Sequence, residues 1–475
     1  MIRLRTHLMG EAMMARKTLK KALLSLSVAV ALGCTAGNTF ADGSTRVQEL
    51  ETRVAELEAL VTQLLQNQQS MAAVDVVEQV EIVEIEARAE AIAEEKVLMM
   101  LAEEKAIKEA EAKKHTFKVG GYVKADVIAS DYSDGAVASG SIGRDFYIAG
   151  TVPVSPDGVR AGESYLDFHA KESRINFKST HNLDNGAKMS TFIEMDFLAT
   201  GTGNERVSNS YAPRLRHAFL TYNNWLFGQT WMTFFNVGAL PENLDFVGPA
   251  ESTIFGRQTQ IRYTSGNWQF ALENPETTIT PYGGGARIVA DDNKVPDGVV
   301  RYNVKGDWGN FTVAGLVRQL RYQNRALGIK DSTSGYGISL SGKFAIGEKD
   351  DFRWMASTGK GMGRYMGLNT ANGAVLKEDG SLKAINSTGV FGSFRHFWSE
   401  SLRSNLTLGY LWVDNKTDYT GSGVTKDAAS LHVNLIYSPQ PKLDFGIEYM
   451  YANREIESGY NGNMNRIQFS AKYAY

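Results

Sequence analysis

The chain lacks several features that would assign it to common classes of protein. It has one cysteine, Cys34, among 475 residues, which excludes an intrachain disulfide. It has no apolar run of about 20 residues, which excludes a transmembrane helix. From His115 onward, 36 basic residues stand against 35 acidic ones, so net charge favours neither anions nor cations. Any charge selectivity must therefore come from where the charges are placed.

Catalytic and metal-binding patterns are also missing. His169, His217, His396 and His432 fall on expected strands without an obvious Ser or Asp partner. The glycines of 283–285 and around Gly363 are not followed by the strand-to-helix context of a phosphate cradle. We therefore expect no enzyme, no cofactor and no metal site. A barrel lipase stays open as an alternative, which an acyl-ester assay would test.

The N-terminus is typical of an export signal. A basic segment, 16–21, precedes a short apolar run, 22–32, and Thr39-Phe40-Ala41 places small residues where a signal peptidase reads. Cleavage after Ala41 predicts a signal peptide over 1–41 and removes Cys34. A weak lipoprotein box, 31–34, leaves lipidation of Cys34 as the alternative.

A helical pattern follows the signal. Apolar residues recur at alternating steps of three and four, which indicates a coiled-coil stalk over 42–73. They are Val47, Leu50, Val54, Leu57, Val61 and Leu64. An amphipathic helix packed on a domain is the alternative. A coiled coil implies self-association without fixing its number, and the glutamate-rich 74–115 predicts an acidic helical spacer.

Beyond 116 the apolar period changes to two, which is the period of a strand. In the last segment, Ile467, Phe469 and Tyr473 alternate with Arg466, Gln468 and Lys472. A soluble sandwich would have to bury the charged parity, which is costly, whereas a membrane barrel turns it to an aqueous lumen. Short turns also alternate with long loops, as in outer-membrane barrels. We predict an all-β transmembrane barrel of about 16 antiparallel strands over 116–475.

Several segments in order resemble the DcaP-type porins. They are P-R-L-R-H-A-F-L-T-Y from Pro213, W-L-F-G-Q-T-W from Trp225, A-L-P-E-N-L-D-F-V-G-P from Ala239, R-Q-T-Q-I-R-Y from Arg257, A-G-L-V-R-Q-L-R-Y from Ala314, Arg395-H-F-W and R-I-Q-F-S-A-K-Y from Arg466. The resemblance implies a trimer of 16-stranded barrels behind periplasmic coiled coils. It also implies diffusion of small anionic solutes, dicarboxylates among them. Met232, Phe235-Asn236 and Tyr475 depart from the family pattern, so the pore lining is expected to differ.

Arginines are the candidate solute contacts, because a guanidinium is always charged and its fork matches a carboxylate. The predicted pore residues are Arg214, Arg216, Arg257, Arg262, Arg301 and Arg318, with Arg174, Arg353 and Arg395 also at plausible lumen or rim positions. The loop 233–253, with Glu242, Asp245 and Phe246, is expected to fold inward and oppose them. The alternative is that each arginine only pairs with an acid such as Glu194, Asp196, Glu273 or Glu448.

These patterns predict an outer-membrane porin for small, preferentially anionic solutes, with its stalk in the periplasm. The expected partners are outer-membrane lipid, two further copies in a homotrimer, small anions and, through the stalk, peptidoglycan, but no nucleic acid. Tyr475 is expected to be the signal for barrel assembly. The alternative function is a tether between the outer membrane and the cell wall, in which the pore is incidental.

Overall fold

The computed structural model describes residues 52, 54–56, 58, 59, 62, 63, 87, 88, 91–105, 114–156, 159, 161–201 and 203–475. The chain divides into two compact units, Met1–Lys105 and Ala106–Tyr475. In the first unit, the described residues are helical, with a continuous run over 91–105. The predicted signal peptide lies outside the described residues, and so does most of the predicted coiled coil. No helix among the described residues has the length and apolarity needed to cross a bilayer.

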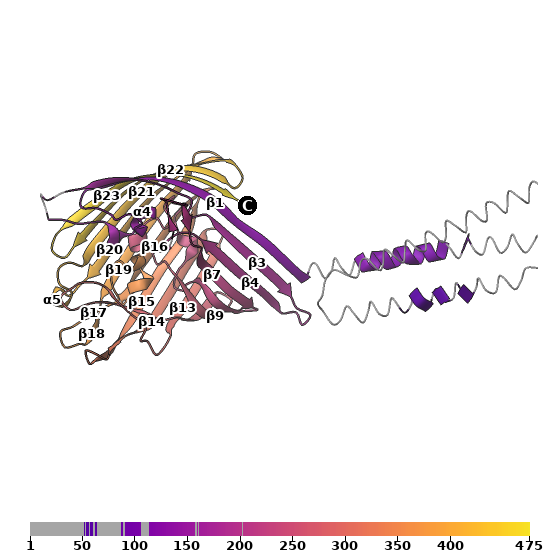
Figure 1. Ribbon diagram of the computed structural model, residues 1–475, viewed down its shortest axis with the longest axis horizontal. Helices are drawn as coiled ribbons and strands as arrows, with labels where there is room; N and C mark the ends of the chain where they lie inside the picture. Colours follow the sequence, from indigo (N-terminus) through magenta and orange to yellow (C-terminus); the bar gives the residue numbers. More distant parts are fainter. Residues whose placement is uncertain are drawn as a thin grey trace, which may run out of the picture. The chain divides into compact units, whose positions relative to one another are not determined.

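The second unit is a closed antiparallel β-barrel (Figure 1). Its main sheet holds 17 named strands, and two of them, β2 and β3, pair in turn with the two halves of β1 and share one position in the ring. Sixteen positions result, as the sequence predicted. The strands are β1 (His115–Tyr132), β2 (Glu163–His169), β3 (Arg174–Asn182), β4 (Lys188–Asp196), β7 (Arg214–Tyr222), β8 (Trp225–Trp231), β9 (Arg257–Ser265), β10 (Trp268–Glu273), β13 (Asp297–Gly306), β14 (Gly309–Asn324), β15 (Ile329–Ile346), β16 (Asp350–Lys360), β19 (Asn386–Phe397), β20 (Leu402–Asp414), β21 (Thr425–Gln440), β22 (Leu443–Ile456) and β23 (Asn461–Ala474).

The last strand closes the ring against the first. Val127 of β1 lies opposite Phe469 of β23, and the ladder runs from Tyr122 to Tyr132. Along β23, Ile467 and Phe469 are 51% and 45% exposed on the outer face, while Arg466 and Gln468 are 1% and 3% exposed on the inner one. The alternation in the sequence therefore becomes an apolar outer wall and a polar lumen. A membrane barrel, and not a sandwich, is confirmed.

The long connections all lie at one rim. Tight turns join β7 to β8, β9 to β10, β13 to β14 and β21 to β22 at the other rim, and the rim of the long loops also carries two short turns, β14–β15 and β22–β23. The segments 274–296 and 361–385 meet there in a small sheet of β12 (Ile288–Ala290), β11 (Thr277–Thr280), β17 (Ala374–Leu376) and β18 (Leu382–Ala384). A second small pair, β5 (Gly203–Asn204) with β6 (Ser210–Tyr211), lies between β4 and β7.

Three of the long connections pack together into the main core cluster. They are 133–162, with helices α4 (Ile142–Asp145) and η1 (Ala149–Thr151), 232–256, with η2 (Val237–Ala239) and η3 (Ala250–Ser252), and 361–385, with η4 (Gly363–Tyr365) and η5 (Gly367–Asn369). A further short helix, α5 (Thr417–Thr420), lies between β20 and β21. Phe234, Phe235 and Tyr147 are at most 1% exposed, so these loops are packed against one another and the wall. They reduce the space inside the barrel.

Candidate functional site

The connection 232–256, called here the inner loop, runs along the inside of the barrel wall. It leaves β8 after Trp231, and its successive residues contact β9, β13, β16, β19 and β20 in the order in which these strands stand in the ring. Its far end reaches β22, β23 and β1. The predicted loop 233–253 is this segment, and the structure places it inside the barrel.

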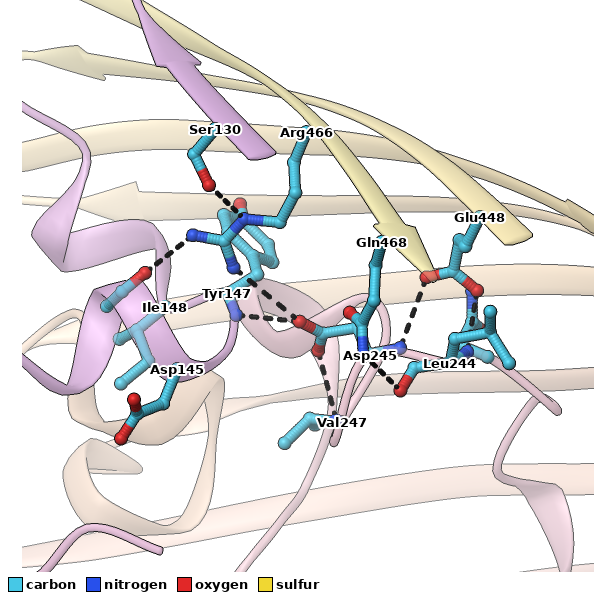
Figure 2. Close-up of polar contacts among 12 residues, drawn as sticks. Ser130, Asp145, Tyr147, Ile148, Leu244, Asp245, Val247, Glu448, Arg466 and Gln468 are labelled. Atoms are coloured by element: carbon cyan, nitrogen blue, oxygen red, sulfur yellow. Dashed lines mark hydrogen bonds and ion pairs between the residues drawn. The ribbon is translucent and has the colours of Figure 1, made fainter. Parts of the chain in front are cut away.

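The far end of the inner loop is held by buried polar side chains (Figure 2). Glu448 of β22 accepts hydrogen bonds from the backbone N–H groups of Leu244, at 2.7 Å, and Asp245, at 3.3 Å. The Leu244 carbonyl accepts from Lys124 Nζ at 2.8 Å and from Gln468 Nε2 at 3.1 Å. The wall side chains therefore supply partners for the Leu244 and Asp245 N–H groups and for the Leu244 carbonyl, which are buried polar groups that need them.

Asp245, one of the predicted loop residues, ties the inner loop to the loop 133–162. Its carboxylate accepts from the Tyr147 N–H at 2.8 Å and lies 3.9 Å from Arg466 Nη1 (Figure 2). It also accepts from the Val247 and Gly248 N–H groups, which fixes the turn. Asp245 is only 3% exposed. The structure therefore places Asp245 as a structural anchor on the side of the loop that faces β23.

The returning limb of the inner loop carries Glu251 against β21. Ser430 Oγ donates to Glu251 Oε1 at 2.8 Å, and His432 connects Ser430, at 3.2 Å, with Glu448, also at 3.2 Å. His432 thus has serine and glutamate partners, so the expectation that it has none was wrong. The Ser430 hydroxyl donates its proton to Glu251, and all three of Ser430, His432 and Glu448 are at most 4% exposed. This chain of bonds joins the loop to the wall.

Two loop carboxylates respond differently to their burial. Burial raises the pKa of Glu251 to about 7. Burial also tends to raise the pKa of Glu242. Hydrogen bonds and positive charge from Arg403 and Arg395 outweigh this effect and hold the pKa of Glu242 below its ordinary value. Glu242 is therefore a fixed negative charge of the loop at neutral pH, whereas Glu251 lies close to its titration point.

Four arginines gather on β3, β7 and β9, and this group is called here the arginine cluster: Arg174, Arg214, Arg216 and Arg257. Arg214 makes two parallel bonds to Asp196, at 2.9 and 2.8 Å. Arg216 bridges Glu194 and Asp196 at 2.7 Å each and is 1% exposed. Arg174 lies 3.6 Å from Glu194. The cluster therefore places four guanidinium groups around two carboxylates.

Arg257 differs from the other members of the cluster. Among the described residues no acid lies within ion-pair distance of Arg257, and its Nη1 has no hydrogen-bond partner. Its guanidinium lies 4.8 Å from the centroid of the Trp231 ring. Arg216 stacks over the same ring and over Phe246 of the inner loop, at 5.7 and 5.4 Å. Phe246, a predicted loop residue, thus reaches the arginine cluster.

A backbone bulge explains how β7 presents consecutive polar residues. Glu194 pairs with His217 and Met195 pairs with Leu215, so Arg216 is the extra residue. Arg216 and His217 are both buried, and Leu215 is 48% exposed on the outer wall. Simple alternation assigns Arg216 to the lumen but leaves His217 outside it. The outward-facing residues change parity from Leu215 to Leu220 and Tyr222, and this change is the trace that the bulge leaves in the sequence.

Other predicted arginines bind the backbone of the wall or of the loops. Arg262 donates to the carbonyl of Trp231, the last residue of β8, and Arg301 to the Phe235 carbonyl of the inner loop, at 2.6 Å each. Arg318 pairs with Asp297 at 3.2 Å and donates to the carbonyls of Glu276 and Gly361. The loop residue Glu242 is bound by Arg395 at 2.9 Å and Arg403 at 2.6 Å. Tyr475 donates its backbone N–H to Gly121 beside the closing ladder, and its role in assembly stays a prediction.

The loop 361–385 brings an arginine that sequence reasoning passed over. Arg364 Nη2 donates to Gln258 Oε1 at 2.5 Å, next to Arg257 in the chain. Its neighbour Tyr365 lies 3.1 Å from Glu273 and 3.0 Å from Asp297. Glu273 in turn accepts from the Thr233 N–H of the inner loop at 2.5 Å. The two loops therefore share one anchoring carboxylate on the wall.

A family model and several solved structures are similar to this chain. The family model of the DcaP outer membrane protein matches residues 87–475. The outer membrane channel DcaP of Acinetobacter baumannii has a similar structure, with a TM-score of 0.61 and 24% identity over 76% of this chain and 98% of that one. OmpT of Vibrio cholerae, as a loop L8 deletion mutant, has a TM-score of 0.47 and 11% identity over 76% and 100% of the two chains. No match was found among curated proteins.

Proposed function

Since this chain belongs to the DcaP outer membrane protein family and is a bacterial outer-membrane channel, we propose that it passes small hydrophilic solutes passively and prefers anions. Dicarboxylates are the solutes that the arginine cluster would suit, because one guanidinium binds one carboxylate in a two-pronged fashion. We further propose that three copies assemble in the membrane, with lipid around the outer wall.

The observation that carries this proposal is the excess of guanidinium groups in the arginine cluster. Glu194 and Asp196 neutralise two of the four positive charges. Arg257 adds a positive charge that no acid among the described residues pairs with, although its Nη1 is buried, and Arg214 keeps 23% of its side chain exposed. We assign direct solute contact to Arg214 and a mainly electrostatic role to Arg257. Arg216 is buried and acts through the field that it adds.

Arg257→Gln tests the anion preference. The substitution removes one positive charge and leaves no described carboxylate without its partner. A unit charge about 10 Å from a permeating ion in water contributes about 0.4 kcal/mol, which is about a twofold change in relative permeability. We expect the reversal potential in a salt gradient across a planar bilayer to shift toward cations. Arg325→Gln removes the same charge from the exposed β14–β15 turn, whose strands do not adjoin β3, β7 or β9, and should leave the potential unchanged.

Added succinate separates a dicarboxylate channel from a general anion channel. Succinate should cause brief current blocks in the wild-type channel and fewer in Arg257→Gln. A reversal potential that is the same in wild type and Arg257→Gln would remove the cluster from the selectivity. A barrel that inserts but does not conduct would contradict the channel proposal itself.

A further inference from the structure

Four arginines follow the inner loop around the barrel wall: Arg301 on β13, Arg353 on β16, Arg395 on β19 and Arg403 on β20. They are called here the wall arginines. Their loop partners are the carbonyls of Phe235 and Leu240 and then the carboxylate of Glu242. The order of partners along the chain matches the order of strands around the ring. Such a match indicates one continuous seam between the outgoing limb of the loop and the wall.

Each wall arginine is held by the wall before it reaches the loop. Arg301 donates from Nε to Asn303 at 2.6 Å and from Nη1 to the Phe235 carbonyl at 2.6 Å. Arg353 donates from Nε to Asp351 at 2.7 Å and from Nη1 to the Leu240 carbonyl at 2.6 Å. Because a guanidinium is planar, fixing its Nε edge aims its remaining N–H groups at the loop.

The other two wall arginines also contact both the wall and the loop, but through other edges of the guanidinium. Arg395 reaches Glu242 from Nη1, and Arg403 reaches it from Nε and Nη2. Arg395 binds Asp351 as well as Glu242, and Arg403 binds Asp444 at 3.2 Å as well as Glu242. Carbonyls in a loop without ladder partners would otherwise be left unsatisfied. The wall arginines supply those missing donors.

Glycines on the inner face make room for the rest of the loop. A Cβ at Gly389 would lie 2.9 Å from the Cα of Ser252, and one at Gly409 would lie 2.6 Å from the Cβ of Pro249. At Gly446, a Cβ would lie 2.8 Å from Leu244. These glycines stand on β19, β20 and β22, so the wall has a slot for the returning limb and the tip. The slot does not involve the arginines, and it indicates that the loop fits the wall in one position, called here the seat of the inner loop.

We propose that the wall arginines are positioning residues that hold the inner loop against the wall and thereby set the width of the opening. This inference rests on the proposed channel function. It divides the lumen arginines into two groups. The arginine cluster supplies the field and the solute contacts, and the wall arginines fix the loop that faces the cluster.

A charge-preserving double variant, Arg301→Lys/Arg353→Lys, separates positioning from electrostatics. Lysine keeps the positive charge but cannot hold a wall acceptor and a loop carbonyl with two edges of one plane. We expect amide hydrogen exchange in residues 233–243 to become about tenfold faster or more, as for the loss of a hydrogen bond to a charged group. Open-channel current noise should rise, and the reversal potential should stay at the wild-type value.

Arg325→Lys is the matched control, because it makes the same exchange on the exposed β14–β15 turn. Glu242→Gln is a second variant that leaves every arginine in place. It removes the loop carboxylate and so weakens the contacts of the loop with Arg395 and Arg403. Glu242→Gln should also raise exchange in residues 233–243. Folding of each variant is checked by the shift in gel mobility between heated and unheated samples.

The proposal is overturned if Arg301→Lys/Arg353→Lys and Glu242→Gln leave exchange in residues 233–243 at the wild-type rate. It is also overturned if Arg301→Lys/Arg353→Lys shifts the reversal potential as Arg257→Gln does, since that result would make these residues solute contacts. Hydrogen exchange needs no current, so a loop that loosens in a barrel that does not conduct would contradict the channel function and leave the positioning role supported.

Discussion

At the scale of single residues, the arginines of the lumen differ in what their removal would leave behind. Arg216 is 1% exposed and bridges two carboxylates, Glu194 and Asp196, which are 8% and 0% exposed. Arg257 has no such partner among the described residues. A buried acid that loses its cation keeps the full cost of its desolvation. The same substitution should therefore have different effects on stability at the two positions.

Arg216→Gln should lower the free energy of unfolding by about 3 kcal/mol, the usual cost of breaking a buried pair from one side. Arg257→Gln should change it by less than about 1 kcal/mol, because no acid is stranded. Urea unfolding of the barrel in detergent, followed by tryptophan fluorescence, measures both values. Equal unfolding midpoints for the two variants would mean that water in the lumen solvates Glu194 and Asp196 well enough to replace Arg216.

At the scale of elements, the position of the inner loop depends on wall positions that are occupied by glycine and therefore leave space for the loop. Gly409 of β20 faces inward between the outward-facing Leu408 and Tyr410. A Cβ there would overlap Pro249 and the Glu251 carboxylate of the inner loop. A proline ring cannot move aside as a flexible side chain can. The loop itself must shift if the slot is filled.

Gly409→Ala should therefore destabilise the seat of the inner loop by about 1–3 kcal/mol, the usual cost of overpacking. Amide exchange in residues 243–253 should become faster, and channel closures should become more frequent. Gly315→Ala is the matched control, because it adds the same methyl group to β14 where nothing lies within 4 Å. If amide exchange in residues 243–253 and the frequency of closures are the same in Gly409→Ala and Gly315→Ala, then the returning limb is free to rearrange and the slot has no role.

The strands were predictable from the sequence and the contacts of the loop were not. Alternation such as that of Ile467 and Phe469 with Arg466 and Gln468 has one physical cause, the two solvents on the two faces of the wall. The hydrogen bond that the Leu244 N–H donates to Glu448 joins residues 204 positions apart, and no local pattern indicates it. For the same reason Arg301 and Arg353 look like any other lumen arginines in the sequence. Their partners become apparent only once the inner loop is placed in the barrel.

At the scale of the whole molecule, the barrel contains everything that the proposed function uses. The closing ladder of β1 with β23, the arginine cluster and the seat of the inner loop all lie within 115–475. The unit Met1–Lys105 is separate by its contacts, and the predicted coiled coil lies in it. Conduction and assembly are therefore expected to depend on different parts of the chain.

Deletion of residues 42–105, with the export signal kept, should leave the conductance of a single barrel unchanged, because the wall and the inner loop are intact. If the coiled coil holds three barrels together, the full chain should insert in steps of three equal levels and the deletion variant in single steps. Planar-bilayer recordings of both proteins in the same salt measure conductance and step pattern together. A deletion variant that still inserts in threes would assign assembly to the barrel wall, and one with altered single-level conductance would mean that the N-terminal unit reaches the pore.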